Sequence, residues 1–237
     1  MRSLNGSDLL VVFTGTEETN RRFLKLLKHF SGLSVPLIRI APISSEIEEF
    51  KRCVRVHKPD LLVFTSKTAV NLVKKLADLI TESALMAIGP GTADSLRRIG
   101  ARSVLMPVEH TSAGLLRILS GLDRDLSVQL VSSAKVNEDL ANIVEEFREG
   151  RCFRLYDIEP DEEGIRRLQD LGRCAVVLTC GTAAKAFRRI RENHITIAMS
   201  PRIADILGDA DFVYKGGTSE FVRSLERFLM SRTRKGS

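Results

Sequence analysis

Two kinds of hydrophobic pattern alternate along the chain. Short apolar runs are typical of buried strands, and longer stretches with apolar residues every three or four positions are typical of amphipathic helices. The predicted strands are Leu9–Phe13, Val35–Ile40, Leu61–Phe64, Leu85–Ile88, Ser103–Met106, Val128–Val131, Phe153–Ile158, Ala175–Leu178, Thr196–Met199 and Phe212–Val213. The predicted helices are Glu17–Phe30, Ser45–Val56, Ala69–Leu79, Gly91–Ile99, Ser112–Leu119, Asn137–Phe147, Glu162–Leu171, Ala183–Asn193, Pro201–Leu207 and Ser219–Met230. This alternation predicts an α/β fold with parallel sheets and helices on both faces.

An internal repeat indicates that the α/β unit is duplicated. The segments from Leu61 to Leu119 and from Ala175 to Phe228 show the same order of features. Each has a strand ending in a hydroxyl residue, a helix, a strand ending in a proline-containing turn, a helix, a strand, and a helix preceded by Thr-Ser. Two weaker copies of the opening unit occur at VVFTGTEETNRRF and LVSSAKVNEDL. We therefore expect two similar lobes.

Two extended, proline-containing segments divide the chain into these lobes. They are Leu33–Ile43 and Arg151–Asp161, and they bracket one complete repeat. If the chain crosses along one segment and returns along the other, one lobe is continuous and the other contains both termini. The expected first lobe is residues 1–40 with 159–237, the second is residues 41–152, and the hinge strands lie near residues 35–40 and 153–158. A connection this narrow predicts that the lobes move relative to each other.

The turns that follow the predicted strands supply the candidate binding residues. Ligands of parallel α/β sheets bind beyond the carboxyl ends of the strands. Because each turn precedes a helix, its hydroxyl can cap free backbone N–H groups, or those N–H groups can hold a carboxylate or phosphate. Six such turns around a shared cleft could bind several anionic groups. The candidate substrate-binding residues are Thr14, Thr65, Ser66, Lys67, Gly89, Pro90, Thr92, Ser132, Ser133, Lys135, Thr179, Cys180, Gly181 and Arg202.

Composition narrows the range of partners. The 237 residues carry a formal net charge of +6, which indicates an anionic partner. The basic residues are spread along the chain without interleaved aromatic residues, so a small polyanionic substrate is favoured over nucleic acid. No apolar run has the length of a membrane span, and the N-terminus resembles a strand more than a signal peptide. We expect a cytoplasmic monomer without a membrane partner.

The sequence lacks the common cofactor and metal motifs. It contains no GxGxxG, GxxxxGK[ST], GxSxG or HExxH pattern. The four cysteines, Cys53, Cys152, Cys174 and Cys180, form no CxxC pair and have no zinc-ligand spacing with the four histidines. We expect buried or incidental thiols, no metal and no cofactor, and we assign no catalytic residue.

The segments FTSKTAV, AIGPGTADSLRRIG, VLMPVEHTSAGLL and RLYDIEP, with their degenerate second set, resemble uroporphyrinogen-III synthase along nearly the whole chain. The resemblance implies two lobes joined by a two-stranded hinge, with the active site in the inter-lobe cleft. It implies a cofactor-free lyase of tetrapyrrole biosynthesis, the route to porphyrins and heme. Such an enzyme cyclises hydroxymethylbilane to uroporphyrinogen III with loss of water and inversion of the terminal pyrrole ring. The eight carboxylates of that substrate suit a basic protein.

Three features depart from the family pattern. The family commonly has a tyrosine, the favoured proton donor, on the helix after the returning hinge strand. Here that helix, DEEGIRRLQDLG, has none, and Tyr156 matches a different, hinge-strand tyrosine. The second copy of the GPxT turn reads SPRI, and the first strand ends in FTGTEE where many members carry Thr-Arg-Pro; Arg202 or Lys135 could supply the missing charge. Two interpretations stay open: an active synthase, or a non-catalytic tetrapyrrole- or anion-binding regulatory relative with the same two lobes.

Overall fold

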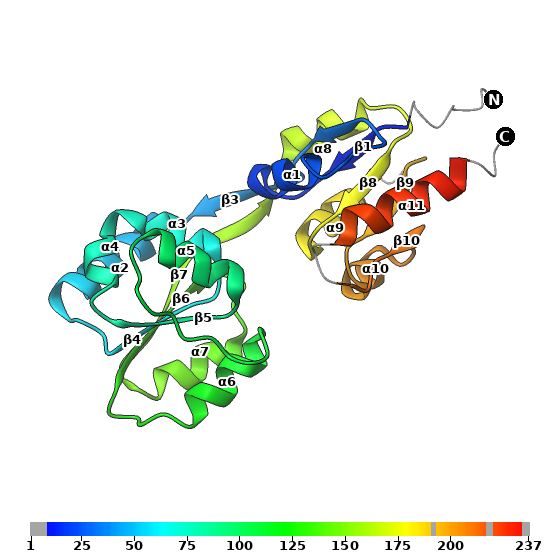
Figure 1. The fold of residues 1–237 in the computed structure, drawn as a ribbon. Helices are drawn as coiled ribbons and strands as arrows, with labels where there is room; N and C mark the ends of the chain where they lie inside the picture. Colours follow the sequence, from blue (N-terminus) through cyan, green and yellow to red (C-terminus); the bar gives the residue numbers. More distant parts are fainter. Residues whose placement is uncertain (1–8, 191–192, 217–219, 234–237) are drawn as a thin grey trace. The chain divides into compact units, whose positions relative to one another are not determined.

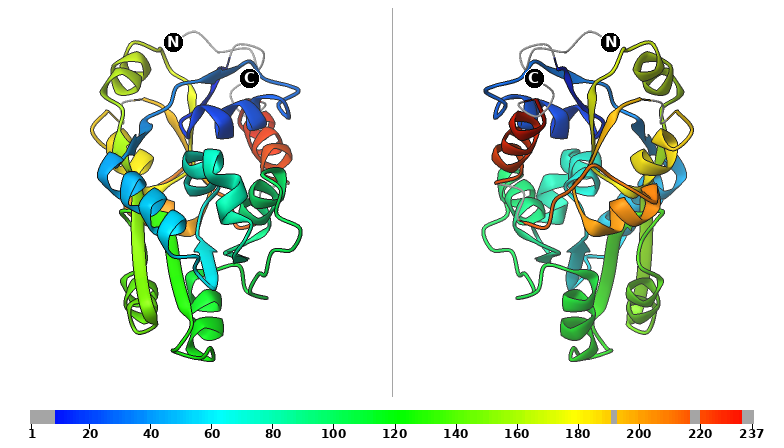
Figure 2. Two further views of the ribbon diagram at one scale, coloured as in Figure 1. Left: turned by 90° about the vertical axis from the view of Figure 1, so that its left-hand side faces the viewer. Right: turned by 90° about the vertical axis from the view of Figure 1, so that its right-hand side faces the viewer.

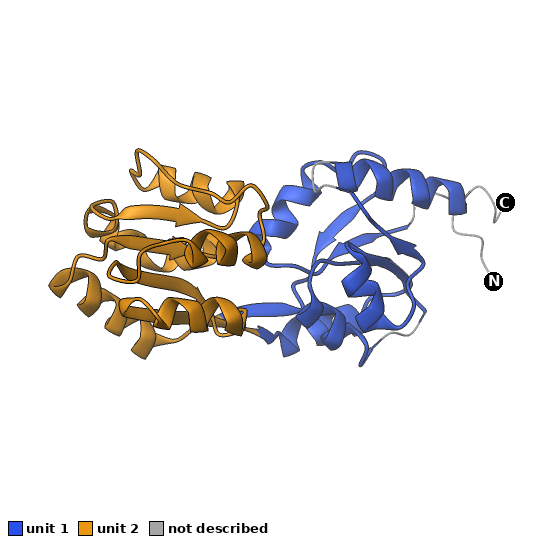
Figure 3. Cartoon of the chain, turned by 90° about the horizontal axis from the view of Figure 1, so that it is seen from below, with its two compact units in different colours: residues 1–40, 159–237 blue, residues 41–158 orange. Residues whose placement is uncertain are grey.

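Strands and helices alternate along residues 9–190, 193–216 and 220–233, which are the residues that the computed structural model describes. The chain divides into two compact units, shown in separate colours in Figure 3. Unit 1 is Met1–Ile40 with Glu159–Ser237, and unit 2 is Ala41–Ile158. Within the described ranges, no helix has both the length and the apolar character that a membrane span requires.

Unit 2 is built on a sheet with the strand order β3-β7-β6-β4-β5. The strands are β3 (Ile38–Pro42), β4 (Leu61–Phe64), β5 (Ala84–Ala87), β6 (Ser127–Ser133) and β7 (Arg148–Pro160). Parallel pairing joins β4 to both β5 and β6, and β6 to β7. One face carries α2 (Ser44–Val56), α3 (Lys67–Val73), α4 (Ala77–Ile80) and α5 (Pro90–Arg98); the other carries α6 (Ser112–Ser120) and α7 (Glu138–Glu145) (Figure 1).

Unit 1 is built on a second sheet, with the order β10-β9-β8-β1-β2. Its strands are β1 (Val11–Phe13), β2 (Gly32–Ser34), β8 (Ala175–Leu178), β9 (Ile195–Ala198) and β10 (Phe212–Val213). Its helices are α1 (Glu17–Leu24), α8 (Glu162–Gln169), α9 (Gly181–Phe187), α10 (Pro201–Leu207) and α11 (Phe221–Thr233). α1 and α11 lie side by side in both views of Figure 2, and the rings of Phe23 and Phe221 are 5.5 Å apart.

The two sheets repeat one strand order. β9, β8, β1 and β2 occupy in one sheet the places that β5, β4, β6 and β7 occupy in the other. In each sheet the chain leaves two adjacent strands in opposite directions. In unit 2, β4 is followed by β5 on one side and β6 by β7 on the other. In unit 1, β8 is followed by β9 on one side and β1 by β2 on the other. Parallel sheets bind ligands at such topological switch points, beyond the carboxyl ends of the strands. The predicted α/β class with two duplicated parallel sheets is confirmed.

The predicted strand Val35–Ile40 is wrong as a single element. The structure divides this region between the two sheets, with β2 ending at Ser34 and β3 beginning at Ile38. Pro36 lies between them, and proline has no N–H to donate to a strand ladder. The returning strand β7 is 13 residues long, so it extends well beyond the predicted Phe153–Ile158. β3 and β7 are neighbours in the sheet of unit 2.

Other elements also differ from the predictions. Ser103–Met106 forms only an isolated bridge, from Leu105 to Met86, because this segment is largely exposed. The first helix ends at Leu24 rather than Phe30, and the backbone N–H groups of Lys28 and His29 donate to the Glu226 carboxylate instead. The predicted helix Ala69–Leu79 is divided into α3, a 3-10 turn and α4. α9 ends early, and the predicted helices ending at Asn193 and starting at Ser219 include residues outside the described ranges.

Asp211 stabilises the edge of the unit 1 sheet through hydrogen bonds to its carboxylate. Its Oδ2 accepts hydrogen bonds from the backbone N–H and the hydroxyl of Thr196, at 2.8 and 3.0 Å, and Arg232 donates to Oδ1. Burial raises the pKa of Asp211, but the hydrogen bonds from Thr196 and Arg232 outweigh burial and lower the pKa overall. The ionised carboxylate therefore stabilises the folded chain above its unfolded-state pKa, and this contribution disappears as the pH falls through the lower folded-state pKa.

We predict that Asp211→Asn reduces the acid sensitivity of the fold. Urea unfolding at about pH 6 and about pH 3 should show a larger loss of unfolding free energy for the unchanged protein than for the variant. Asp94→Asn is the control, because that side chain makes an exposed pair with Arg97. Equal losses for the unchanged protein and Asp211→Asn would contradict the role of this carboxylate.

Candidate functional site

The switch point of unit 2 carries a pair of hydroxyl groups. Thr65 follows β4, Ser132 lies near the end of β6, and their hydroxyl oxygens are 2.7 Å apart. The backbone continues the same pairing, because the Thr65 N–H donates to the Val131 carbonyl at 3.2 Å. Ser132 is buried and Thr65 is partly buried. Two predicted residues from separate parts of the chain thus meet at the carboxyl edge of the sheet.

Ser66 joins this edge to β7 through Tyr156. The Tyr156 hydroxyl donates to Ser66 Oγ at 2.9 Å, and the backbone N–H of Ala69 donates to the same oxygen at 3.0 Å. Tyr156 is only 4% exposed, so its hydroxyl is held in place by the surrounding packing. Ser66 Oγ accepts both of these hydrogen bonds, and its own O–H is a group that can still donate. The pair can therefore pass a proton outward from the tyrosine through the serine.

The Gly89-Pro90 turn forms the next part of this edge. Gly89 caps α5 with its backbone only, and its carbonyl accepts from the N–H groups of Thr92 and Ala93 at 3.1 and 3.0 Å. Thr92 is inside α5 and buried, so its hydroxyl is not on the surface of the turn. A Cβ placed on Gly91 would lie 3.6 Å from the Lys67 side chain. The Lys67 side chain therefore lies against the N-terminal turn of α5.

Lys135 and Ser133 lie beside β7. The Lys135 ammonium donates to the Ile158 carbonyl at 2.5 Å and lies 3.2 Å from the Asp157 carboxylate. Ser133 is the register partner of Tyr156. Lys135 therefore binds the carboxyl half of β7, at the point where the chain leaves unit 2.

The switch point of unit 1 is packed more tightly. The Thr14 hydroxyl is fully buried and donates to the Val177 carbonyl of β8 at 2.7 Å. A Cβ on Gly15 would lie 2.8 Å from Thr179 Oγ1, so the absence of a side chain lets the two strand ends approach closely. Asn20 lies below this turn and donates to the Gly15 carbonyl at 3.0 Å. Thr14 is therefore internal, and Thr179 is the hydroxyl residue nearer the surface.

The remaining predicted residues of unit 1 begin two helices. Cys180 is the N-cap of α9, without a hydrogen bond from its side chain, and Gly181 is the first residue of that helix. A Cβ on Gly181 would meet the Ile206 side chain at 2.9 Å, so α9 and α10 approach closely here. Ser200 caps α10 by accepting from the Ile203 N–H at 3.4 Å. Arg202 is exposed in the first turn of α10.

The hydroxyl groups of these turns were candidates either for capping the following helix or for a place beside a bound anion, and only some of them are caps. Ser66 and Ser200 are caps. Thr14 and Thr65 bond to neighbouring strands instead, because they still lie within the sheet edge. α1 is capped by Thr16 and α7 by Asn137, which agrees with the predicted helix starts and lies a few residues beyond the strand-end hydroxyls. The acidic pairs after these two residues, Glu17-Glu18 and Glu138-Asp139, were the available signal, since acidic residues favour the first turn of a helix.

Burial accounts for two of the four cysteines. It raises the pKa of Cys152 and of Cys174 to about 11, so both thiols stay protonated at neutral pH. The Cys174 sulfur is 3.3 Å from His194 Nδ1, and burial lowers the pKa of that histidine. A neutral imidazole beside a protonated thiol does not generate a thiolate nucleophile. Among the described residues, no three His, Cys, Asp or Glu side chains are grouped so that they could bind a metal.

Comparison with known proteins identifies the family. The family model described as uroporphyrinogen-III synthase HemD matches residues 25–213. A curated protein of Methanothermobacter thermautotrophicus, named "Putative uroporphyrinogen-III synthase", is 38% identical over 76 residues. That alignment spans 30% of this chain and 30% of the relative.

Solved structures show the same fold. A mutant uroporphyrinogen III synthase from the extremely thermophilic bacterium Thermus thermophilus matches with a TM-score of 0.59 and 19% identity, over 94% of this chain and 99% of that chain. The wild-type protein in a second crystal form matches with a TM-score of 0.52 and 18% identity over the same shares. The family model covers most of the chain, and the solved structures share its fold. The chain belongs to the uroporphyrinogen-III synthase (HemD) family.

Proposed function

We propose that this protein is an active uroporphyrinogen-III synthase, a hydro-lyase of tetrapyrrole biosynthesis. It would cyclise hydroxymethylbilane to uroporphyrinogen III with loss of water and inversion of the terminal pyrrole ring. The observation that carries this proposal is the family match over residues 25–213. The hydroxyl-bearing switch points in both sheets and the net charge of +6 support it, because both suit a polyanionic substrate.

The proposed substrate site consists of the carboxyl edges of the two sheets. In unit 2 the edge offers Thr65, Ser66, Lys67 and the Gly89-Pro90 turn, and in unit 1 it offers Thr179 and the N-terminal turns of α9 and α10. We infer that the two edges bind one substrate in a cleft between two mobile lobes. The lobes would correspond to the two units, and the hinge to β3 and β7, where the chain passes between them.

The proposed reaction needs one proton donor. The carbon–oxygen bond of the terminal hydroxymethyl group breaks, and the hydroxyl leaves as water after it takes a proton. The terminal ring then joins in the inverted orientation, and the ring carbon that forms the closing bond gives a proton back to the ionised donor, so that protons balance over the reaction. We propose that Ser66 delivers the first proton and Tyr156 resupplies it, because these two hydroxyls already share a hydrogen bond. The rest of the catalysis would come from binding the substrate in one conformation, because that conformation favours closure to the type III ring over closure to the type I ring.

The lack of a tyrosine on α8 favours a second candidate function. That helix reads EEGIRRLQ, and it is the position where the family commonly has its proton donor. A relative without activity would still bind a tetrapyrrole or a similar anion. Separating the type I and type III ring products distinguishes the two functions, because only an active synthase yields type III. We further propose a cytoplasmic monomer that needs no metal or organic cofactor and has no nucleic-acid or membrane partner.

We predict that binding energy is spread over several hydroxyl groups. Thr65→Val and Thr179→Val should each weaken substrate binding by about 1 kcal/mol, the usual net value of one hydrogen bond. Steady-state KM values for uroporphyrinogen III formation would measure the effect. Thr81→Val is the matched control, because that hydroxyl donates to the Ala77 carbonyl at the end of α4, away from the strand ends. If Thr81→Val raised KM as much as the two edge variants do, the assignment of these hydroxyl groups to the substrate site would be contradicted.

A further inference from the structure

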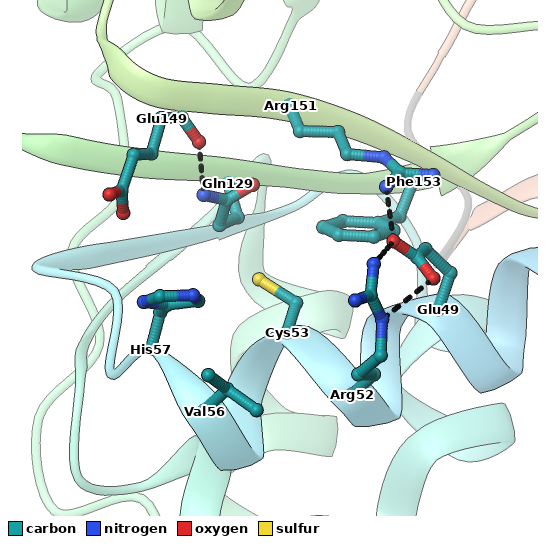
Figure 4. Close-up of a pocket in the computed structure, with 9 residues that line it drawn as sticks. All are labelled: Glu49, Arg52, Cys53, Val56, His57, Gln129, Glu149, Arg151 and Phe153. Atoms are coloured by element: carbon teal, nitrogen blue, oxygen red, sulfur yellow. Dashed lines mark hydrogen bonds and ion pairs between the residues drawn. The ribbon is translucent and has the colours of Figure 1, made fainter.

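A cavity of about 300 Å³ lies in unit 2 between α2 and the sheet (Figure 4). Its floor is formed by neighbouring residues of β6 and β7, Gln129 and Arg151, which are register partners. Its wall is one face of α2, where Glu49, Cys53 and His57 recur every four residues. Gln129 is near the amino end of β6, so the cavity lies under α2 and apart from the carboxyl edge proposed for the substrate.

Gln129 leaves a buried acceptor in this cavity without a donor. The side chain is 2% exposed, and its Nε2 donates to the Glu149 carbonyl at 2.6 Å. This hydrogen bond orients the amide, and Oε1 has no hydrogen-bond partner among the described residues. Figure 4 shows the amide facing the Cys53 sulfur across the cavity. Buried side-chain oxygens are normally satisfied, so this one indicates a missing donor.

The residue that orients the Gln129 amide, Glu149, has a strained backbone. Glu149 has a φ of 55°, a left-handed conformation that non-glycine residues seldom adopt. It lies opposite the register shift between Ser127 and Gln129, where the ladder of β6 and β7 is irregular. Irregularities of this kind often re-aim side chains beside binding sites. Here the strained residue offers its carbonyl to Gln129 and lines the cavity with its side chain.

The two ends of the cavity differ in chemistry. At one end, the Glu49 carboxylate accepts hydrogen bonds from both Arg52 and Arg151, the latter at 2.7 Å. The hydrogen bond from Arg52 and then that from Arg151 lower the pKa of Glu49, so it stays ionised. Each guanidinium carries five N–H donors, and Glu49 engages only some of them. This end can therefore still donate to an anionic group.

The other end offers acceptors. Glu149 and His57 lie around it, and the Gln129 amide lies between the two ends with its nitrogen toward Glu149 (Figure 4). Glu49 is on α2 and His57 is the C-cap eight residues later, a separation of about 12 Å along the helix axis at 1.5 Å per residue. Cys53 and Val56 lie between the ends and provide apolar contact. The lining carries two carboxylates, Glu49 and Glu149, and two guanidiniums, Arg52 and Arg151.

We propose that this cavity binds a small zwitterion, a molecule with an ammonium group and a carboxylate separated by several methylene groups. The ammonium donates to Gln129 Oε1 and pairs with Glu149. The carboxylate accepts from Arg52 and Arg151, and the methylene groups cover Cys53 and Val56. Because the ligand bridges α2 and β7, it connects elements next to the two points where the chain passes between the units. The site is separate from the proposed synthase site and does not depend on it.

Nuclear magnetic resonance of the full chain tests this proposal directly. The chain contains only two glutamines, Gln129 and Gln169, so selective ¹⁵N-glutamine labelling gives two side-chain amide signals. Gln169→Met assigns them, because Gln169 is exposed and outside the cavity. Titration with 6-aminohexanoate should shift the Gln129 signal to saturation and leave Gln169 unchanged. Hexanoate and hexylamine, which each lack one charged group, should bind at least about tenfold more weakly.

Two matched variants separate the site from general effects of charge. Arg52→Met should weaken the binding of 6-aminohexanoate about tenfold and leave the weak binding of hexylamine unchanged. Arg97→Met should change neither, although Arg97 makes the same i,i+3 pair with an acid on an exposed helix face. The proposal is overturned if no probe shifts the Gln129 signal, if the one-ended probes bind as tightly, or if both variants weaken binding equally. None of these outcomes bears on ring closure.

Discussion

Replacing Tyr156 with Phe is expected to slow the formation of uroporphyrinogen III by about 100-fold or more, the usual contribution of a positioned acid. The change removes one oxygen from a side chain that is 4% exposed, so the packing around it is retained. What is lost is the donor to Ser66 Oγ, 2.9 Å away, and with it the resupply of the proton that Ser66 passes on. Initial rates of type III product measure the effect, and kcat should fall more than KM rises.

Tyr214→Phe is the matched control. The chain contains two tyrosines, and Tyr214 is also buried, but it packs against Phe221 in the core of unit 1. That variant should keep a rate within a few-fold of the unchanged protein, apart from any loss of stability that thermal unfolding reveals. If Tyr156→Phe keeps a normal rate while it is folded, another group protonates the leaving hydroxyl and the assignment of this pair is wrong.

Replacing Gly164 with Ala is expected to destabilise the protein by about 3 kcal/mol or more. A Cβ at this position would lie 1.7 Å from the Pro36 carbonyl oxygen and 2.9 Å from its carbon. Both are backbone atoms of the segment between β2 and β3, so a rotamer change cannot relieve the overlap. Either α8 or that segment must shift, and overpacking of this kind costs about 1–3 kcal/mol or occasionally more. The urea midpoint measures the loss.

Gly172→Ala is the comparison, because within the described part of the chain no atom beyond the neighbouring residues lies within 4 Å of the Cβ that it would add. Its effect on the unfolding free energy should be small, and a slight gain is allowed because alanine restricts the unfolded chain. Similar midpoints for Gly164→Ala and Gly172→Ala would show that α8 does not pack against the Pro36 carbonyl as described.

Local patterns predicted the fold class because burial imposes them. Apolar runs such as Leu61–Phe64 and Ala175–Leu178 are fully buried central strands, as continuous apolar strands of parallel sheets are expected to be. The repeat carried further information, since equivalent segments occupy equivalent places in the two sheets. Hydrophobic period does not tell which sheet a residue joins. The region around Pro36 therefore looked like one strand, although it supplies β2 to one sheet and β3 to the other.

The candidate edges were predicted only in outline. The carboxyl ends of strands could be located, so Thr65, Ser66 and Ser132 were identified from the sequence. Their bonds could not be, because Ser66 meets Tyr156 over a separation of 90 residues, and Thr65 meets Ser132 over 67. The type of side chain also does not show how deeply it is buried. Thr14 and Thr179 have the same hydroxyl group, but Thr14 is fully buried and Thr179 is only partly buried. These contacts depend on strand order, which becomes evident only in the folded chain.

The ratio of ring isomers formed from hydroxymethylbilane is the most direct test of the central claim. Without enzyme, hydroxymethylbilane closes to the type I ring, so any type III product must come from the protein. The purified chain, treated with a chelator and free of nucleotide, is expected to convert most of the substrate to type III. Tyr156→Phe should return the mixture towards type I, and Tyr214→Phe should not. Type I as the sole product of the folded protein, over a range of pH and temperature, would contradict the synthase assignment.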